Sequence, residues 1–435
     1  MLINGLKGLA ANLAGALMLA LALAGCSTPC DAPGRLCAPI GSNTSAPPSP
    51  QQHPRAELPA PGRAATAPVE SAPFETRPVE PPGAGASLGT GRRETRIGLM
   101  LPLRSEALGA PAEALRAGFM AAFERDREGF TVNLVETGDS PQETLDAYAA
   151  AIQQNDIMVG PLARPAVSAL AASPLVRKPT IALNHPEARA GAAALPAQML
   201  VIGLSIEDEA RQVANWAGFD HPGGMAMIIS GSSAWQRRIA ASFAARWKQL
   251  GYASQMLVLA DSNGYLSEAS LGQLRSQLDD AQPALLFTAL DASQAGQVRG
   301  ALGPDLPVYG TSSVNPGINA GANAGTDPGA AMAELDGLRL LDLPWEVDSA
   351  HPAVMAYPRW SGAGRTLDMD RLYALGIDAY RVAREITLRP GADFQLDGVT
   401  GRLSVSFGNG PARFERVEPA ALYQGGRFTL VPDGR

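Results

Sequence analysis

Residues 225–260 read MAMIISGSSAWQRRIAASFAARWKQLGYASQMLVLA, and this stretch decides the fold class. The apolar runs at its two ends, 225–230 and 255–260, have the length and composition of buried strands. Between them, 234–251 has the pattern of an amphipathic helix, because its large apolar side chains recur at every fourth position. These side chains are Trp235, Ile239, Phe243 and Trp247. The stretch therefore predicts two parallel strands joined by a helix, with both tryptophans in the core.

The same alternation runs through the rest of residues 94–435. Further apolar runs of strand length lie at 96–103, 130–136, 157–160, 180–184, 284–290 and 307–310. Helical patterns separate most of them, and Ser205 with Asp208 has the form of a capping box at the start of one helix. A long helix is predicted over 367–388, where Gly376 permits close approach of a neighbour, and strands follow over 398–407 and 414–431. We therefore expect an α/β protein with mostly parallel sheets flanked by helices.

Composition and charge exclude several classes of function. The 435 residues carry 35 basic and 42 acidic side chains, a formal charge of -7, and no run rich in lysine and arginine. Nucleic acid is therefore not an expected partner. The cysteines are Cys26, Cys30 and Cys37, so the body of the chain has no cysteine nucleophile, cysteine zinc site or iron–sulfur cluster.

The N-terminal segment has the features of a lipoprotein leader. Residues 8–25 form an apolar run that ends in Leu-Ala-Gly before Cys26, and no basic stop-transfer cluster follows. This ending resembles a bacterial lipobox, which implies that 1–25 is a signal peptide and that Cys26 becomes acylated and holds the protein to membrane lipid. An ordinary secretory signal with an incidental cysteine is the alternative. Ser27 in place of aspartate resembles the sorting signal for the outer membrane.

Residues 26–93 are expected to form a tether. From 27 to 93 there are 14 prolines, and alanine, glycine and serine make up most of the rest. Such a stretch cannot bury enough apolar area to offset its ordering entropy, so we predict disorder. Stretched as polyproline II it would reach roughly 200 Å. Cys30 and Cys37 could pair within it as a minor loop closure.

The body contains no recognisable catalytic constellation. Of the four histidines, His185, His221 and His351 each precede proline and read as loop residues, while His53 lies in the tether. No metal site is expected, because no two histidines share a helix face. No G-x-S-x-G or S-x-x-K motif is present, and Trp235 stands where a nucleophile elbow at 231–235 needs a small residue. We expect no catalytic residues and no cofactor.

An open α/β sheet binds ligands in the crevice at the carboxyl ends of its strands. The hydroxyl, amide and guanidinium groups that follow the predicted strands are therefore the candidate lining of a cleft between lobes. These candidates are Arg104, Ser105, Asn184, Ser232, Ser233, Thr311 and Ser312. Turn residues that cap helices are an equally good reading of each one alone.

Eight motifs in order carry a resemblance to a known family. They are IGLMLPL at 97–103, VGPL at 159–162, IALN at 181–184, GLSIEDEA at 203–210, LDGLR at 335–339, PW at 344–345, RLYALGIDAY at 371–380 and GVTGRLS at 398–404. Together they resemble the LpoA/LppC family of lipoproteins, which activate a bifunctional class A penicillin-binding protein. Better-known members carry an N-terminal helical domain, and here the Pro-rich tether occupies the corresponding space.

The resemblance implies a type I periplasmic-binding-protein-like fold with two lobes. Lobe one would comprise about 94–204 and 313–390, and lobe two about 205–312 and 391–435. It further implies a non-enzymatic outer-membrane lipoprotein, facing the periplasm, that binds and activates a class A penicillin-binding protein in peptidoglycan synthesis. The alternative is a solute-binding lipoprotein that delivers an amino acid or similar small molecule to an importer. A small-molecule ligand is not expected on the first reading.

Overall fold

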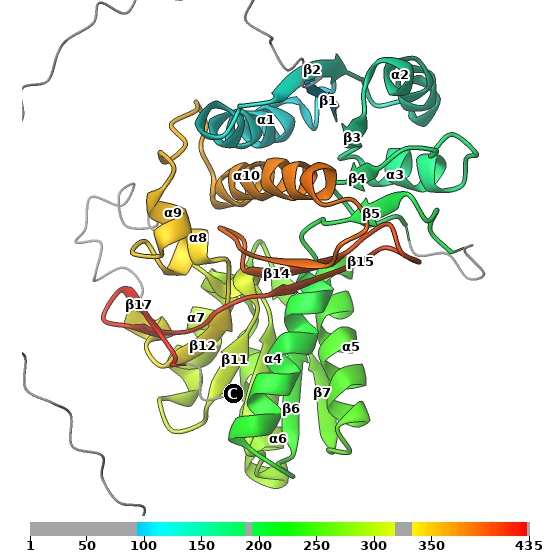
Figure 1. Ribbon diagram of the computed structural model, residues 1–435. Coiled ribbons are helices and arrows are strands. Elements are labelled where there is room, and N and C mark those ends of the chain that lie inside the picture. Colours follow the sequence, from blue (N-terminus) through cyan, green and yellow to red (C-terminus); the bar gives the residue numbers. More distant parts are fainter. Residues whose placement is uncertain (1–93, 188–193, 318–332, 433–435) are drawn as a thin grey trace, which may run out of the picture. The chain divides into compact units, whose positions relative to one another are not determined.

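The computed structural model describes residues 94–187, 194–317 and 333–432 (Figure 1). The expected signal peptide, the expected lipidation at Cys26 and the expected tether all fall outside these residues. Two mostly parallel sheets organise the described chain, and a small antiparallel sheet accompanies the first of them. We call the two parallel sheets, each with its flanking helices, the first and second lobes.

The first lobe has five parallel strands in the order β2-β1-β3-β4-β5. The strands are β1 (Thr95–Leu101), β2 (Phe130–Glu136), β3 (Ile157–Val159), β4 (Thr180–Ala182) and β5 (Met199–Val201). Alternate residues of β1 face opposite sides, which places Leu99 against α1 (Gly109–Arg125) and α10 (Leu367–Leu388). Met100 on the other side packs with residues of α2 (Pro141–Gln154) and α3 (Arg164–Ala171).

The second lobe repeats this strand order. Five of its strands are parallel in the order β7-β6-β10-β11-β12, and two antiparallel strands extend the sheet beyond β12. The strands are β6 (Ala226–Ser230), β7 (Ser254–Val258), β10 (Leu285–Ala289), β11 (Val308–Gly310), β12 (Leu338–Leu341), β16 (Ala420–Gln424) and β17 (Arg427–Leu430). Ile228 packs with α4 (Ile206–Asp220) and α5 (Ala234–Gln249), and Ile229 packs on the opposite face with α6 (Glu268–Ala281) and α7 (Ala292–Leu302).

The remaining elements are short. The third sheet is an antiparallel meander of β13 (Phe394–Asp397), β14 (Arg402–Ser406) and β15 (Arg413–Val417). The others are the hairpin β8 (Asp261–Ser262) and β9 (Tyr265–Leu266), the 3-10 turns η1 (Ser312–Val314) and η2 (Ala333–Leu335), and the helices α8 (Pro344–Val347) and α9 (Pro352–Met355).

Local sequence explains the helices well. Ser205 accepts a hydrogen bond from the Asp208 N–H at 3.1 Å, so the predicted start of α4 is confirmed. Ile239, Phe243 and Trp247 of α5 are fully buried, as the stripe predicts. Trp235, in the first turn, is only partly buried against the same core. Gly376 of α10 lies against α1, where an added Cβ would come within 2.1 Å of the Leu115 carbonyl oxygen. Figure 1 shows these two helices side by side.

All eight strands expected within 96–310 are present, with ends shifted by a few residues. The expectation for the later chain is partly wrong. The expected lobe boundaries place residues 338–341 in the first lobe, but β12 pairs with β11 and belongs to the second. Conversely, they place the residues of β13–β15 in the second lobe, yet Phe394, Leu403 and Val405 are buried with the core of the first. Long-range pairing, which apolar runs do not encode, decides both placements.

The chain passes between the two sheets at three places among the described residues. These are the segments between β5 and α4, between β12 and α8, and between β15 and β16. We call them the first, second and third crossings.

Candidate functional site

The described residues offer no metal centre and no membrane span. Residues 94–187, 194–317 and 333–432 contain no group of three or more histidine, cysteine, aspartate or glutamate side chains placed to hold a metal ion. None of the helices described there has both the length and the apolar character that crossing a bilayer requires.

The candidate cleft residues of the first lobe are engaged by local partners. Arg104 pairs with Glu143 and donates to the Glu136 carbonyl oxygen at 3.0 Å. Ser105 is buried and accepts from the Leu108 N–H at 2.9 Å. The Asn184 Oδ1 accepts from Arg164 Nε at 3.3 Å and from the N–H of the following residue at 2.9 Å.

The second-lobe candidates behave in the same way. Ser232 donates to Asp261 at 3.0 Å, and Ser233 is the N-cap of α5. Thr311 caps η1, where its hydroxyl accepts from the Ser313 N–H at 3.4 Å. These contacts are those of residues that lie in turns or cap helices, which was the alternative interpretation. A role of the seven residues in ligand binding stays a prediction.

Cavities of about 970, 420 and 360 Å³ lie elsewhere in the described part of the chain. None of the seven candidates lines them. His185 lines the first two, and Glu418 of the third crossing lines the second and third. Burial lowers the pKa of His185, so the ring is held neutral beside the Gly203 carbonyl oxygen, 3.3 Å away.

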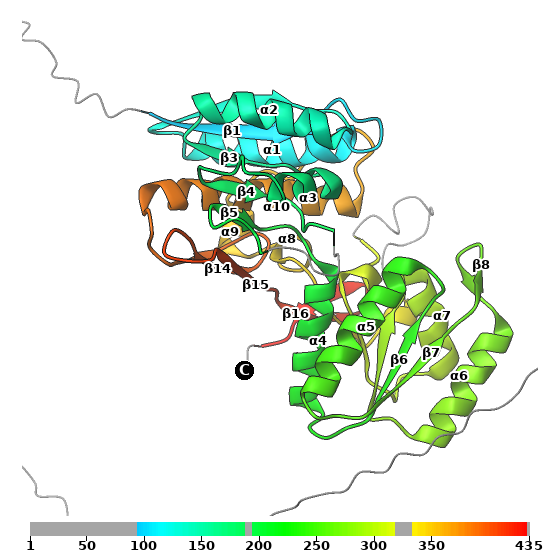
Figure 2. The same cartoon turned by 90° about the vertical axis from the view of Figure 1, so that its right-hand side faces the viewer.

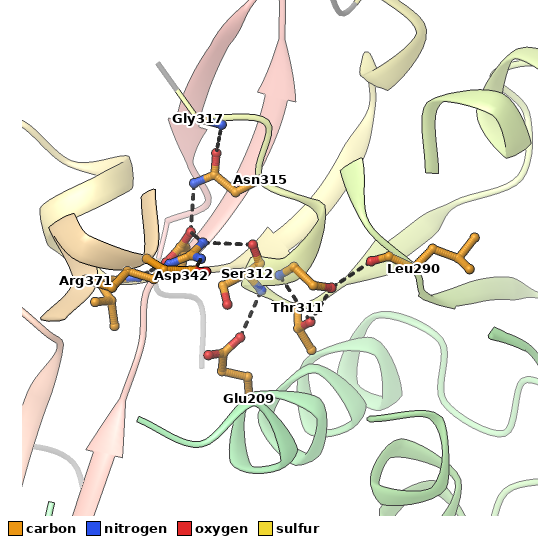
Figure 3. Close-up of polar contacts among 11 residues, drawn as sticks. Glu209, Leu290, Thr311, Ser312, Asn315, Gly317, Asp342 and Arg371 are labelled. Atoms are coloured by element: carbon orange, nitrogen blue, oxygen red, sulfur yellow. Dashed lines mark hydrogen bonds and ion pairs between the residues drawn. The ribbon is translucent and has the colours of Figure 1, made fainter. Parts of the chain in front are cut away.

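Six charged residues and one serine lie together at the crossings, and we call this set the junction cluster. Figure 3 labels four of its members, Glu209, Ser312, Asp342 and Arg371. Five members lie in a crossing or in an element that adjoins one, whereas Ser312 lies in η1 and Arg371 lies in α10. The members are Glu209, Ser312, Asp342, Glu346, Arg371, Arg416 and Glu418.

Arg371 is the centre of the cluster. Its guanidinium lies 2.7 Å from Asp342 Oδ2 and donates to the Ser312 carbonyl oxygen at 2.8 Å. The N–H of Ser312 in turn donates to Glu209 Oε2 at 2.9 Å. Figure 3 shows this chain of contacts running from α10 through η1 to α4. One arginine of the first lobe thus fixes two segments of the second.

Two further contacts complete the junction. Asn315 donates to Asp342 Oδ2 at 2.7 Å, and the Leu343 N–H donates to its other oxygen at 2.8 Å. At the opposite side, Arg416 donates to the carbonyl oxygens of Ile202 at 2.8 Å and Gly203 at 3.2 Å. The end of β15 that leads into the third crossing is therefore bonded to the first crossing.

The cluster has more acids than bases. Four buried carboxyl groups share two buried guanidinium groups, and desolvation disfavours their charged forms. Burial, reinforced by the charge of Asp342, raises the pKa of Glu209 to about 7 and that of Glu346 to about 8. Burial and the charge of Glu209 raise the pKa of Glu418 well above its ordinary value. Burial alone would lower the pKa of Arg371, but Asp342 and the glutamates raise it instead.

This arrangement can set the geometry between the two lobes. The hydrogen bonds that it makes depend on which of its carboxyl groups are protonated. It offers no nucleophile with an adjacent base. Sequence reasoning did not find it, because its members come from segments far apart in the chain, and Glu209 belongs to a run of three acids that reads as the charged first turn of a helix. The available signal was a charge within a buried run, as with Asp342 in LRLLDLPW and Arg371 at the start of RLYALGIDAY.

The comparisons with known proteins agree on the family. Residues 90–409 match the model of the LppC lipoprotein family. The chain belongs to the LppC lipoprotein family. A curated relative is the penicillin-binding protein activator LpoA of Photobacterium profundum, 25% identical over 346 residues that cover 71% of this chain and 53% of the relative. The chain spans about half the length of the curated relatives it matches.

Solved structures confirm the fold. The C-domain of LpoA (YraM) from Haemophilus influenzae, described as a regulator of PBP1A, matches with a TM-score of 0.59 and 24% identity, over 78% of this chain and 100% of that domain. A Chromobacterium violaceum protein, assigned by name to a branched-chain amino acid ABC transporter, matches with a TM-score of 0.60 and 35% identity, over 76% of this chain and 100% of its own. The expected periplasmic-binding-protein-like fold of this LppC-family chain is therefore confirmed.

Proposed function

We propose that this chain is a lipoprotein that binds a class A penicillin-binding protein and activates its synthesis of peptidoglycan. The observation that carries the proposal is the match to a complete LpoA C-domain within a chain of the same family. The curated relatives carry the name of activators, and the junction cluster is built to hold lobes rather than to transform a substrate.

Activation requires a difference in affinity between two states of the synthase. A bound regulator raises activity only if it binds the active conformation more tightly than the resting one. A tenfold difference corresponds to about 1.4 kcal/mol. Buried hydrogen bonds join the two lobes, so we expect little conformational entropy to be lost when the body binds, which favours affinity.

In this proposal the N-terminal segment determines where in the cell envelope the protein is held. Acylated Cys26 would anchor the chain in the outer membrane, and 27–93 would let the body reach a synthase across the periplasm. Two or more acyl chains are needed for stable anchoring, since one chain binds only marginally. Labelling with a radioactive fatty acid tests this point, and Cys26→Ser should abolish the label.

Reconstitution tests the function directly. The purified chain and a purified class A synthase from the same organism are mixed, and glycan-strand and crosslink yields are measured with and without the chain. We expect both yields to rise several-fold. Unchanged yields at saturating chain would overturn the proposal, and product formed by the chain alone would overturn its non-enzymatic character.

A second candidate function is solute binding for an importer. It is favoured by the 35% identity to the Chromobacterium violaceum protein. Ligand-induced stabilisation distinguishes this candidate from the first.

A further inference from the structure

Each of the three crossings between the lobes carries one buried glutamate. Glu209 lies in the first turn of α4, directly after the first crossing, Glu346 lies in α8 after the second, and Glu418 lies within the third. Their exposed fractions are 6%, 7% and 4%. Figure 2 shows the third crossing as the path from β15 to β16. A change in the charge of these side chains therefore acts at the segments about which the lobes can turn.

The junction cluster does not supply partners for four charged carboxylates. Asp342 pairs with Arg371 at 2.7 Å, whereas Glu346 Oε1 and Glu418 Oε2 are buried without a hydrogen-bond partner among the residues that the structure describes. The other guanidinium, that of Arg416, donates to two main-chain carbonyl oxygens and a threonine hydroxyl. A buried carboxylate without a partner is far more costly than a neutral carboxyl group. The described arrangement therefore favours protonated glutamates.

The pKa shifts have the direction that this geometry requires. Burial and the charge of Asp342 raise the pKa of Glu209 to about 7 and that of Glu346 to about 8. Burial and the charge of Glu209 raise the pKa of Glu418 well above its ordinary value. An acid whose pKa is raised by folding stabilises the fold while it is protonated, and this stabilisation is lost as pH rises through the raised pKa.

The charges that face Glu346 from outside the cluster are Arg359, Arg365 and Asp370. Arg365 pairs with Asp370 at 2.7 Å, so these two cancel. The guanidinium of Arg359 donates to the Trp345 carbonyl oxygen at 2.6 Å and lies 4.4 Å from the centre of that ring. Glu346 thus has one further cation nearby, and that cation is held by other groups.

The charges around the other two glutamates are also mostly paired. The ion pairs beside them are Glu207 with Arg238, Asp208 with Arg211, Asp378 with Arg381 and His351 with Asp397. The other ionisable groups that line the cavities beside Glu418 are His185, Asp348, Arg402 and Glu415. Pairs of opposite charge leave the excess of acids at the crossings unchanged.

The third crossing has space into which it can move. Glu418 lines two cavities, of about 420 and 360 Å³, and each is larger than the roughly 30 Å³ that one water molecule occupies in the liquid. An ionised Glu418 gains hydration when its segment shifts toward either cavity. Such a shift would strain the bonds from Arg416 to the carbonyl oxygens of Ile202 and Gly203, which join β15 to the first crossing.

We infer that the three crossings form a proton-controlled hinge. While Glu209, Glu346 and Glu418 carry protons, the lobes keep the described arrangement. When these acids release their protons to solvent, repulsion among them and Asp342 separates the crossings and turns one lobe against the other. The inference does not depend on which partner the chain binds.

A distance measured between two spin labels tests the hinge in the full-length chain. Cys26, Cys30 and Cys37 are replaced by serine, and labels are attached through Glu124→Cys in α1 and Gln273→Cys in α6, both at exposed positions. Double electron–electron resonance is recorded from pH 5.5 to pH 8.5. We expect one distance at pH 5.5 and a second population that grows at least threefold by pH 8.5. Its midpoint should lie between pH 7 and pH 8.

A neutral variant and a matched control identify the responsible groups. Glu209→Gln/Glu346→Gln/Glu418→Gln keeps all three crossings uncharged, so we expect one distance at every pH. The control Glu106→Gln/Glu128→Gln/Glu268→Gln removes the same number of acids at exposed positions. It should respond to pH as the labelled parent does.

The remaining results would each overturn the hinge. They are a distance in the labelled parent that does not change with pH, a midpoint below pH 5.5, and a pH response that persists in the neutral variant. The last result would assign the response to other groups, such as His185 or His351. A control that loses the response would make the effect one of net charge.

A single substitution keeps the test decisive if the neutral variant does not fold. Circular dichroism shows whether it folds, and Glu418→Gln alone is measured in its place when it does not. We expect this single variant to form less than half of the second population that the parent forms at pH 8.5. A population equal to that of the parent would overturn the inference.

Discussion

Arg371 and Asp342 form an ion pair of 2.7 Å that connects a helix of the first lobe to the end of a strand of the second. The arginine side chain is 12% exposed and the aspartate side chain is inaccessible. A buried pair of this kind adds little net stability over an apolar pair, because desolvation offsets the attraction. Its consequence is specificity, since each lobe supplies the charge that the other needs.

Removal of Arg371 should therefore be more harmful than removal of the whole pair. Arg371→Met leaves Asp342 buried without its counter-ion, and we expect a loss of about 3 to 5 kcal/mol in the free energy of unfolding. The double variant Arg371→Met/Asp342→Asn should recover part of it, because no buried charge remains unpaired. Urea unfolding of the three proteins measures both effects. A loss below about 1 kcal/mol for Arg371→Met would contradict the assignment.

The raised pKa of Glu346 predicts the direction of a pH effect on stability. Its pKa is about 8 in the folded chain against an ordinary 4.5. Between these values the folded state holds a proton that the unfolded state has released, so stability falls as pH rises, by up to about 1.4 kcal/mol per pH unit. Glu346→Gln mimics the neutral acid and should flatten this part of the profile.

Unfolding free energies at pH 5, 6, 7 and 8 provide the measurement. The difference between Glu346→Gln and the parent should grow in favour of the variant as pH rises. Glu128→Gln changes an exposed acid and serves as the control. A constant difference across the series would show that Glu346 is ionised in the folded chain at every pH tested.

The sequence is a good guide to the elements of this fold and a poor one to their pairing. Strands such as 130–136 and the helix over 367–388 follow from apolar periodicity, which depends on neighbours in the chain. The expected lobe of the strand at 338–341 is wrong, because its partners β11 and β16 are distant in sequence. The junction cluster escapes prediction for the same reason. Its most distant members, Glu209 and Glu418, are more than 200 positions apart in the sequence. Each charged member, taken alone, looks like a residue on a solvent-exposed surface.

The contact between α1 and α10 supplies a packing prediction. An added Cβ on Gly118 would lie 1.9 Å from the Tyr373 carbonyl oxygen, and one on Gly376 would lie 2.1 Å from that of Leu115. Main chain cannot move aside as a flexible side chain can, so Gly376→Ala should destabilise by about 1 to 3 kcal/mol or more through overpacking.

Gly272 is the matched control for this substitution. It lies in α6, and an added Cβ there meets no atom within 4 Å. Alanine is a better helix former than glycine, so Gly272→Ala should raise stability by about 0.5 to 1 kcal/mol. Thermal unfolding of both variants gives the comparison. Equal effects of the two substitutions would exclude close helix packing as the reason for Gly376.

The polar groups of the candidate cleft residues already have hydrogen-bond or ion-pair partners within the protein. We therefore expect weak or absent binding of amino acids. Ser233 is occupied as a helix cap, Arg104 pairs with Glu143, and both main-chain groups of Ser312 bond within the junction cluster. A ligand would have to replace these bonds rather than satisfy free groups. Leucine is a suitable probe, because a similar structure is assigned by name to branched-chain amino acid transport.

A thermal-shift titration with leucine up to 1 mM decides between the two candidate functions. A ligand at 100 times its Kd adds about 2.7 kcal/mol to the free energy of unfolding, which moves the melting temperature by several degrees. We expect a shift below 1 °C. A larger shift that Ser233→Ala and Arg104→Ala reduce would show that the caps open to admit solute, and it would place the chain with the importer receptors. Glycine and glutamate titrated in parallel separate a specific site from a general effect of added solute.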